Sequence, residues 1–441
     1  MDQTRLRLKP NPSAAYKSFI TGSASFNTEY DMDTKEQVDM FSSAFTANPY
    51  TTYAHLHKNA PIYRVMQSNG QPLWLITLYE DAITVLKDPR FVKDFRNAIT
   101  PEQLAELPPN EPTLEIMERN MIESDPPNHT RLRGLVSKAF TLRQIEQLEP
   151  RIQEIAEELL DAVQDKGSME LISEYAFPLP MIVISEMLGI PNEDRDKFHQ
   201  WSKALVEGLS IMNTYPDKTA LAAAAEFFDY IRALLDERRM TPSNNLISAL
   251  ILAEEQGDKL TEDELISMIY LLILAGHETT VNLIGNGILA LLQHPDQLAQ
   301  LKNNPSLIKS AVEEFLRYES SVQTTTSRYT KEDVEISGQV IPKGEQVLVV
   351  LGAANHDPTQ FDKANELDIT REINQHIAFG YGIHHCLGAP LARLEGQIAI
   401  NTLLRRLPNL QLAVTPEELR WRSGLNIRGL QALPVRFKCS V

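Results

Sequence analysis

Cysteine is scarce in this chain: Cys386 and Cys439 are the only two among 441 residues. Two cysteines cannot form the disulfide framework that holds small secreted proteins together, which favours a reducing, cytoplasmic setting. Residues 1–35 are polar and mixed in charge, and they contain no long apolar run. This start predicts neither a signal peptide nor a membrane anchor.

Positive charge is also in deficit, because 42 Lys and Arg stand against 59 Asp and Glu and give a formal net charge of −17. The basic residues form no long block, so the sequence has no electrostatic footprint for nucleic acid. The acidic excess chiefly indicates solubility. An uncharged, mostly apolar stretch at 268–276 is too short to span a bilayer, so we expect no membrane partner.

Linkers and repeats are missing as well. The composition does not shift along the chain in a way that would mark a linker, and no repeat occurs at solenoid periods. We predict a polar, flexible extension over residues 1–40 and a single domain over residues 41–441, a length that one domain can reach when helices dominate.

Strand patterns occur near both ends of the chain. Apolar residues alternate over 62–77 around Asn69 and Gly70, a dipeptide that accepts positive φ at both central positions of a hairpin turn. Similar patterns occupy 334–351 and 433–437. Most of the remaining sequence has helical spacing. The predicted fold class is therefore mainly α with small antiparallel β-sheets.

Proline divides the helical part of the sequence. Residues 142–239 carry apolar side chains at helical spacing, with breaks at Pro178, Pro180, Pro191 and Pro216. Four further prolines lie in residues 100–113, a stretch suited either to an ordered lid over a site or to a flexible tether. We favour the lid.

Three glycines and two histidines surround Cys386 in "FGYGIHHCLG", residues 379–388. The next residues have helical spacing, so the sulfur lies just before a helix N-terminus, where unpaired N–H groups stabilise the thiolate relative to the thiol. Glycines allow sharp turns and close approach to a flat, bulky group. A thiolate held against a planar group suggests heme iron ligation.

A nucleophilic cysteine is the alternative function of this loop, with His384 or His385 as its base. No separate oxyanion-hole motif accompanies it, and histidines one and two residues before a cysteine do not ordinarily present the required geometry. Cys439 belongs to no motif and is interpreted as an ordinary thiol.

A long helix is predicted from Thr261, which has capping-box spacing with Glu264, to the residues before Pro295. In mid-helix, "HETT" at 277–280 places a carboxylate and two hydroxyls where a hydroxyl can bond the carbonyl four residues back. Taken alone, this pattern favours a buried threonine that is satisfied within its own helix. His277 is interpreted as a packed or solvated side chain.

The cysteine loop resembles the heme-binding signature of the cytochrome P450 monooxygenases, with matches at Phe379, Gly380, Gly382, His384, Cys386 and Gly388. The resemblance implies the cytochrome P450 fold, a bound heme b, Cys386 as the iron ligand and His384 as a contact to a heme propionate. "AGHETT" matches the oxygen-binding segment of the family. It implies that the long helix passes close to the heme at Gly276, and that Glu278 and Thr279 deliver protons to bound O2.

Two further motifs carry the same resemblance. "EEFLRYESS" is similar to the family's Glu-x-x-Arg pair, which implies that Glu314 and Arg317, with Arg371 as a third member, lock the core around the heme. Ser321 stands where the family commonly has proline, which leaves the local backbone path open. In "DPPNHTRLR" and in the later strand, the matching positions imply that the propionates are also held by His129, Arg133 and Arg328.

The resemblance covers the chain from about residue 48 to 437 and is greatest with soluble bacterial enzymes that oxidise polyketide- and macrolide-like molecules. It implies a cytoplasmic monomer that uses O2. Two electrons are expected from a ferredoxin or flavodoxin and its NAD(P)H-dependent reductase. We expect this partner to dock on the cysteine side, near Arg131 and Lys138. The substrate pocket is expected to be lined by residues 91–120, 209–215, the helix before 276, and 322–326.

Other interpretations stay open at this stage. The substrate can instead be a fatty acid or a steroid or terpenoid. The protein can also be a heme-based sensor without turnover, or a cysteine hydrolase without heme.

Overall fold

The computed structural model describes residues 40, 42–67, 70–107, 111–208, 218–255 and 260–439. The predicted N-terminal extension, apart from Met40, lies outside the described residues. So do Asn69 of the predicted hairpin turn, Pro216, and the 209–215 segment expected to line the pocket.

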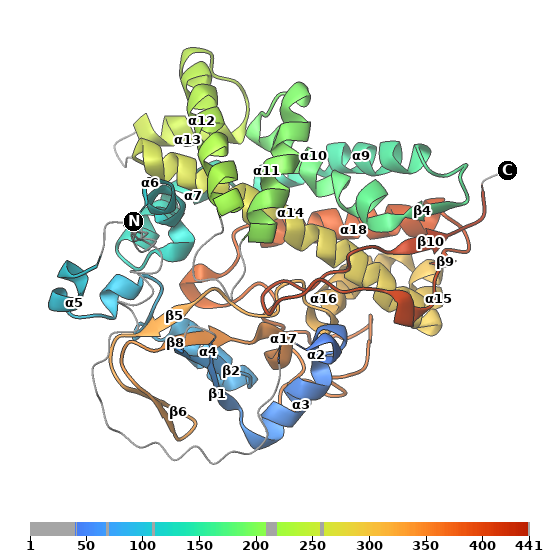
Figure 1. The fold of residues 1–441 in the computed structure, drawn as a ribbon. Coiled ribbons are helices and arrows are strands. Elements are labelled where there is room, and N and C mark those ends of the chain that lie inside the picture. Colours follow the sequence, from blue (N-terminus) through green and yellow to red (C-terminus); the bar gives the residue numbers. More distant parts are fainter. Residues whose placement is uncertain are drawn as a thin grey trace, which may run out of the picture.

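The longest helix, α14 (Glu262–Gln293), runs through the middle of the molecule (Figure 1). The Thr261 hydroxyl accepts the backbone N–H of Glu264, and the Glu264 carboxylate accepts the N–H of Thr261, so the predicted capping box is confirmed. Among the described residues α14 alone is long and apolar enough to cross a membrane, but 72% of its apolar window is buried. It is a core helix.

Helices from both halves of the chain surround α14 (Figure 1). Those before it are α2 (Ser43–Ala47), α3 (Tyr50–Asn59), α4 (Tyr79–Lys87), α5 (Pro101–Ala105), α6 (Pro112–Glu118), α7 (Asn128–Ala139), α8 (Leu142–Gln147), α9 (Glu149–Asp161), α10 (Pro178–Leu188), α11 (Arg195–Gly208), α12 (Lys218–Met240) and α13 (Leu246–Glu255). Those after it are α15 (Pro295–Asn303), α16 (Ile308–Tyr318), α17 (Leu351–Ala354) and α18 (Ala389–Arg406). Pro178 opens α10, where a first helical turn tolerates proline.

The main sheet lies at the other side of the molecule from α9–α13 (Figure 1). Its order is β1-β2-β8-β5-β3, formed by β1 (Ile62–Met66), β2 (Pro72–Ile76), β3 (Phe91–Val92), β5 (Arg328–Thr330) and β8 (Gln346–Val349). The predicted early hairpin is confirmed, because β1 and β2 pair antiparallel from Ile62 with Ile76 to Met66 with Pro72. The sheet differs from the prediction in one detail: β2 and β8 are parallel.

Two smaller sheets complete the fold. One pairs β6 (Val334–Ile336) with β7 (Gln339–Ile341), as the alternation near residue 340 predicts. The other has the order β4-β10-β9, with β4 (Ser168–Glu170), β9 (Gln411–Leu412) and β10 (Pro434–Arg436). Strand β4 was not predicted, since three residues are too short to show a period of two.

The proline-rich segment forms two short helices over its described residues. Its short helices α5 and α6 both begin at a proline, and Thr100 caps α5 through a capping box. Asp125 fixes the chain that leads to this segment, because its carboxylate accepts the backbone N–H groups of Lys93 and Asp94. Its position over a site remains a prediction, and residues 108–110 lie outside the described part of the chain.

A buried carboxylate ties α16 to the chain that leads toward Cys386. Arg317 donates to Glu314 at 2.7 and 2.8 Å, and both side chains have no exposed area. Arg371 donates to the same carboxylate at 3.1 Å, as does Asn374 at 3.0 Å. Arg317 also donates to the carbonyl oxygen of Ala364 at 2.6 Å.

Arg317→Ala is expected to destabilise the fold by about 3–5 kcal/mol, because it leaves the Glu314 charge buried beside fewer donors. Urea unfolding followed by circular dichroism measures this change. If Arg317→Ala does not fold, Arg317→Lys, which keeps the charge but loses the planar fork, is expected to fold with reduced stability. Lys363→Ala breaks an ion pair whose side chains are 66% and 65% exposed and should change stability by less than about 1 kcal/mol. Equal effects at both sites would contradict the role of burial.

Candidate functional site

The cysteine loop is fixed by backbone contacts. The Cys386 N–H donates to the carbonyl oxygen of Phe379 at 2.9 Å, and α18 begins three residues after the sulfur. Gly382 has φ +73°, and a Cβ there would lie 2.7 Å from the carbonyl oxygen of Leu86 in α4. Glycine is therefore required at 382 by the approach of α4. Gly388, with φ −79°, has a conformation open to other residues.

The Cys386 thiol has an electrostatic environment that differs from the prediction. Burial raises its pKa, while the N–H groups of Gly388 and Ala389 and the charges of Arg133 and Arg393 lower it. The helix N-terminus thus acts on the sulfur as predicted, but desolvation is larger. The residue nevertheless has exposed surface.

The predicted propionate contacts lie together. The rings of His129 and His384 are 4.3 Å apart. Burial, together with the nearby charges of Lys93, His129, Arg328 and Arg133, lowers the pKa of His384 to about 2. Burial likewise lowers the pKa of Arg328 to about 10. Four elements distant in sequence therefore bring their donors to one place.

Lys93, directly after β3, is a member of this group that the sequence analysis missed. Its ammonium group is buried and donates to Thr326 Oγ1 and to the carbonyl oxygen of Ser327, both at 2.6 Å. Burial lowers its pKa to about 8. The one signal in the sequence is a lysine that directly follows a buried apolar pair.

These residues fit the heme that the resemblance implies. His129 Nε2 is buried without a protein partner, and it belongs to a group of donors suited to two carboxylates. Cys386 supplies a sulfur ligand. On α14, a Cβ at Gly276 would meet only Ile184, at 3.9 Å, so a side chain could be added here without a clash with the protein. The donor set, the ligand and this open helix face all suit a flat dianionic group.

The acid and alcohol of α14 have different partners. The Thr279 hydroxyl donates to the carbonyl oxygen of Ala275 at 2.8 Å, within its own helix. Glu278 is 5% exposed; its Oε1 lies 2.7 Å from the Arg422 guanidinium in an ion pair and accepts a hydrogen bond from Asn282 at 3.3 Å. His277 packs edge-on against Phe177, as its interpretation as a packed side chain expected.

Glu395 is a second buried acid near this part of α14, and the sequence analysis did not identify it. Burial raises its pKa to about 8, and a hydrogen bond with Thr280 opposes that shift. Its Oε2 has no protein partner among the described residues. The sequence did carry a signal, since Glu395 lies four residues after Leu391 and three before Ile398, on the apolar face of α18.

Comparison with known proteins identifies relatives over most of the chain. The family model described as Cytochrome P450 matches residues 41–418. Cytochrome P450 107B1 of Saccharopolyspora erythraea is 47% identical over 409 residues, which cover 92% of this chain and 99% of that protein. The vitamin D(3) 25-hydroxylase of Pseudonocardia autotrophica is 46% identical over 401 residues, covering 91% and 96%.

A solved structure agrees with these sequence relatives. The structure of the Bacillus subtilis bacillaene polyketide synthase cytochrome P450 PksS matches with a TM-score of 0.84 at 43% identity. The match covers 91% of this chain and all of that chain. Sequence and fold therefore give the same assignment.

The contribution of Lys93 to heme binding is expected to decline as pH rises from about 7 to 9. Its amine, with a pKa of about 8 before heme binds, attracts a propionate only when charged, so its contribution is present below this pKa and lost above it. The Cys386 thiol acts in the opposite direction, because its deprotonation at higher pH favours binding of the heme iron. Heme titration of apoprotein should therefore compare the native chain with Lys93→Met at each pH. The affinity ratio should fall between pH 7 and 9, and a constant ratio would contradict the role of Lys93.

Proposed function

Because the chain belongs to the cytochrome P450 family and is a monooxygenase with thiolate-ligated heme iron, we propose that it hydroxylates a mid-sized hydrophobic substrate of the polyketide or macrolide class. The heme-dependent family assignment replaces the cysteine-hydrolase interpretation of the Cys386 loop. The substrate class rests on the apolar side chains beside α14, taken together with the likeness to the polyketide synthase cytochrome P450 PksS.

In this proposal, Cys386 and the side chains grouped around His384 hold the heme. Cys386 ligates the iron, and His129, Arg133, Arg328 and His384 bind the propionates. Lys93 adds a fifth donor, since its ammonium group is close enough to shift the pKa of His384. When bound through a thiolate, heme supplies the activation of O2 at iron. The protein residues then hold the substrate, exclude water and provide protons.

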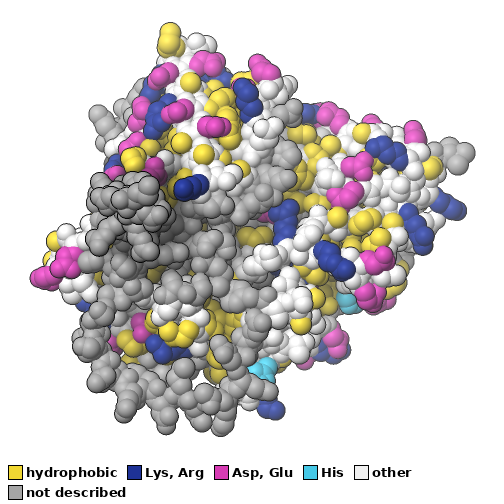
Figure 2. Space-filling view, viewed as in Figure 1, with side chains coloured by type: hydrophobic (Ala, Val, Ile, Leu, Met, Phe, Trp, Pro, Cys, Tyr) yellow, Lys and Arg dark blue, Asp and Glu magenta, His cyan; other side chains and the backbone are white. Residues whose placement is uncertain are grey.

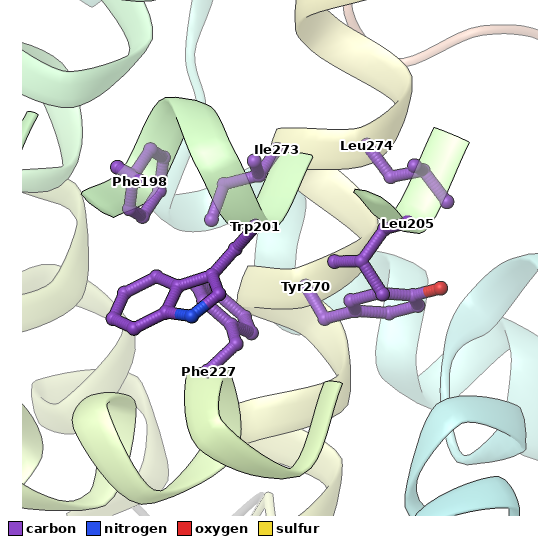
Figure 3. Close-up of a pocket in the computed structure, with 7 residues that line it drawn as sticks. All are labelled: Phe198, Trp201, Leu205, Phe227, Tyr270, Ile273 and Leu274. Carbon is purple, nitrogen blue, oxygen red and sulfur yellow. The ribbon is translucent and has the colours of Figure 1, made fainter. Parts of the chain in front are cut away.

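An apolar wall between α11, α12 and α14 supports a hydrophobic substrate. Figure 3 shows side chains from these three helices pointing toward one small cavity, namely Phe198, Trp201, Leu205, Phe227, Tyr270, Ile273 and Leu274. Ile273 lies three residues before Gly276 on α14, so one edge of this wall neighbours the segment assigned to the heme. The cavity offers only about 10 Å³ to the centre of a water-sized sphere. In this proposal the side chains therefore separate to admit the substrate, and their apolar character favours a ligand with hydrocarbon surface.

Segment 322–326, also expected to line the pocket, has mixed polarity. Thr326 is an exposed residue whose Oγ1 accepts from Lys93, while Thr324 is buried. We propose that this segment contacts a substrate that carries some oxygen atoms, as polyketides do. A fatty acid would use these hydroxyls only at its carboxyl end, which is why it ranks second.

Macrolide aglycones are expected to give larger heme spectral shifts and faster turnover than palmitic acid or vitamin D3 when each is supplied with a surrogate ferredoxin and reductase. The reason is the apolar wall combined with the threonines of 322–326. Difference spectroscopy and product analysis by mass spectrometry measure the two effects. Turnover of the fatty acid or the steroid alone would overturn the proposed class.

Thr279 variants test for turnover in the same assay. Thr279→Ala should lower product per electron roughly tenfold and raise peroxide, because a proton-delivering hydroxyl is lost. Thr279→Ser keeps the hydroxyl and should stay coupled. A heme-based sensor would show no difference among the three proteins.

We propose that a ferredoxin or flavodoxin supplies the electrons, since bacterial relatives of this family use such external partners. The expected docking residues differ in their surroundings: Arg131 is 33% exposed and paired with Glu264, while Lys138 lies in the last turn of α7. On the face drawn in Figure 2, basic and acidic side chains are interspersed over the described residues. We also propose that the protein is a cytoplasmic monomer.

Lys138→Glu is expected to slow reduction by the ferredoxin severalfold, because a surface charge acts mainly on association. The difference in rate between the variant and the native protein should become smaller at high salt, which screens surface charges. Arg131→Glu, which also removes the ion pair with Glu264, should slow the same step. Stopped-flow reduction under carbon monoxide measures both, and heme content serves as the control. Unchanged rates in the double variant would dismiss this docking surface.

A further inference from the structure

Three polar side chains form a stripe on the otherwise apolar middle of α14. Glu278, Asn282 and Asn286 are spaced four residues apart and so lie on one face. They are only 5%, 1% and 1% exposed. Asn282 donates to Glu278 Oε1 at 3.3 Å, and Asn286 donates to the carbonyl oxygen of Arg428 at 3.0 Å. The stripe therefore faces the loop that contains Arg428.

That loop, residues 420–431, closes on itself and lies along α14, dark red beside yellow in Figure 1. The Arg422 N–H donates to the carbonyl oxygen of Gly429 at 2.9 Å. Gly429 lies so close to Asn282 that a Cβ there would collide with the carboxamide. This tight contact places the Arg422 guanidinium 2.7 Å from Glu278 Oε1.

Arg422 connects this buried acid with the outside. Its side chain is 34% exposed, whereas that of Glu278 is 7% exposed. Arg422 also lines a cavity with Tyr53, Gln323 and Arg428, which offers about 10 Å³ to the centre of a water-sized sphere. A space of this size next to polar groups suits about one water molecule.

Buried polar atoms that have no hydrogen-bond partner within the described part of the chain gather at the same junction. They are Asn286 Oδ1, Ser321 Oγ and Thr324 Oγ1. Ser321 accepts the Arg428 N–H at its carbonyl oxygen, and Asn426 donates to the Thr324 carbonyl oxygen, so all three border the loop. Buried polar atoms of this kind normally bind ordered water. This side of α14 is therefore suited to hydration.

We propose that Arg422 is a positioning residue for Glu278, and that Glu278 takes up its protons from the junction between α14 and the 420–431 loop. The positive charge of the Arg422 guanidinium, 2.7 Å from Oε1, holds the carboxylate at this junction. Water at the junction gives a proton to Glu278, and Glu278 passes one to the Thr279 hydroxyl as that hydroxyl gives its own proton to the O2 being reduced. Bulk solvent replaces the proton lost by the water. This inference rests on the proposed role of Glu278 in proton delivery.

Arg422→Gln tests the positioning role in the full holoenzyme. We expect peroxide per product to rise roughly tenfold, in the lower range of proton-transfer effects, and the solvent isotope effect on product formation to increase. Arg422→Lys should restore most of the coupling. Arg420→Gln is the matched control, because Arg420 belongs to the same loop, is exposed and donates to the carbonyl oxygens of Glu417 and Leu419.

A second readout does not depend on turnover. The infrared carboxylate bands of Glu278 in the resting protein can be assigned by difference against Glu278→Gln. Arg422→Gln should shift these bands and Arg420→Gln should leave them in place, with thermal midpoint and heme content equal in both. Identical bands in the native protein and Arg422→Gln would overturn the proposed contact.

Glu278→Gln separates the two possible failures. If it leaves coupling unchanged, the proposed role of Glu278 and the inference about Arg422 both fail, and Glu395 becomes the acid to test. If Glu278→Gln uncouples the enzyme while Arg422→Gln behaves like the native protein, Glu278 keeps its role and only the inference fails. Equal effects of the two single variants and of the double variant support one shared path.

Discussion

The buried carboxylate of Glu314 is the interaction on which the rest of the site depends. It accepts from Arg317, Arg371 and Asn374, and from the backbone N–H of Asp368 at 3.0 Å. These donors come from α16 and from the coil of residues 368–374, which leads directly to the cysteine loop. A coil has no hydrogen-bonded ladder of its own, so a buried charge that gathers several of its donors gives it one conformation. The position of Cys386 relative to α14 follows from this connection.

A neighbouring acid extends this connection to the loop itself. Glu313 accepts from Arg393 at 2.7 and 2.9 Å and from His376 at 3.0 Å, and the hydrogen bonds of these partners hold its pKa at about 2 against the effect of burial. The Arg393 guanidinium also lies 4.6 Å from the ring centroid of Phe379. Successive residues of α16 thus hold the coil before the loop and the helix after it, so both ends of the cysteine loop are fixed from one helix.

Much of this site could be predicted because its residues occur in short motifs. The helix after Cys386, the pairing of Glu314 with Arg317 and the start of the long helix at Thr261 all depend on neighbours within a few positions. Lys93 and Arg422 could not be found in this way, because the partners of Lys93 lie 233 and 234 positions later and Arg422 contacts an acid 144 positions earlier. Tertiary folding alone brings these groups together.

The pKa of the Cys386 thiol shows why a rule based on neighbouring residues can give the wrong direction of shift. A helix N-terminus favours an anion by an amount that depends on a few N–H groups and can be read from sequence. Desolvation depends on every atom packed around the sulfur, and for Cys386 it is the larger effect. The same burial acts on Lys93, Arg328 and His384, whose charged forms it disfavours. An anionic group bound among these cations and a metal bound to the sulfur would each favour the charged form that burial opposes, so the protein fold and the heme are energetically coupled at both the propionate and the iron side.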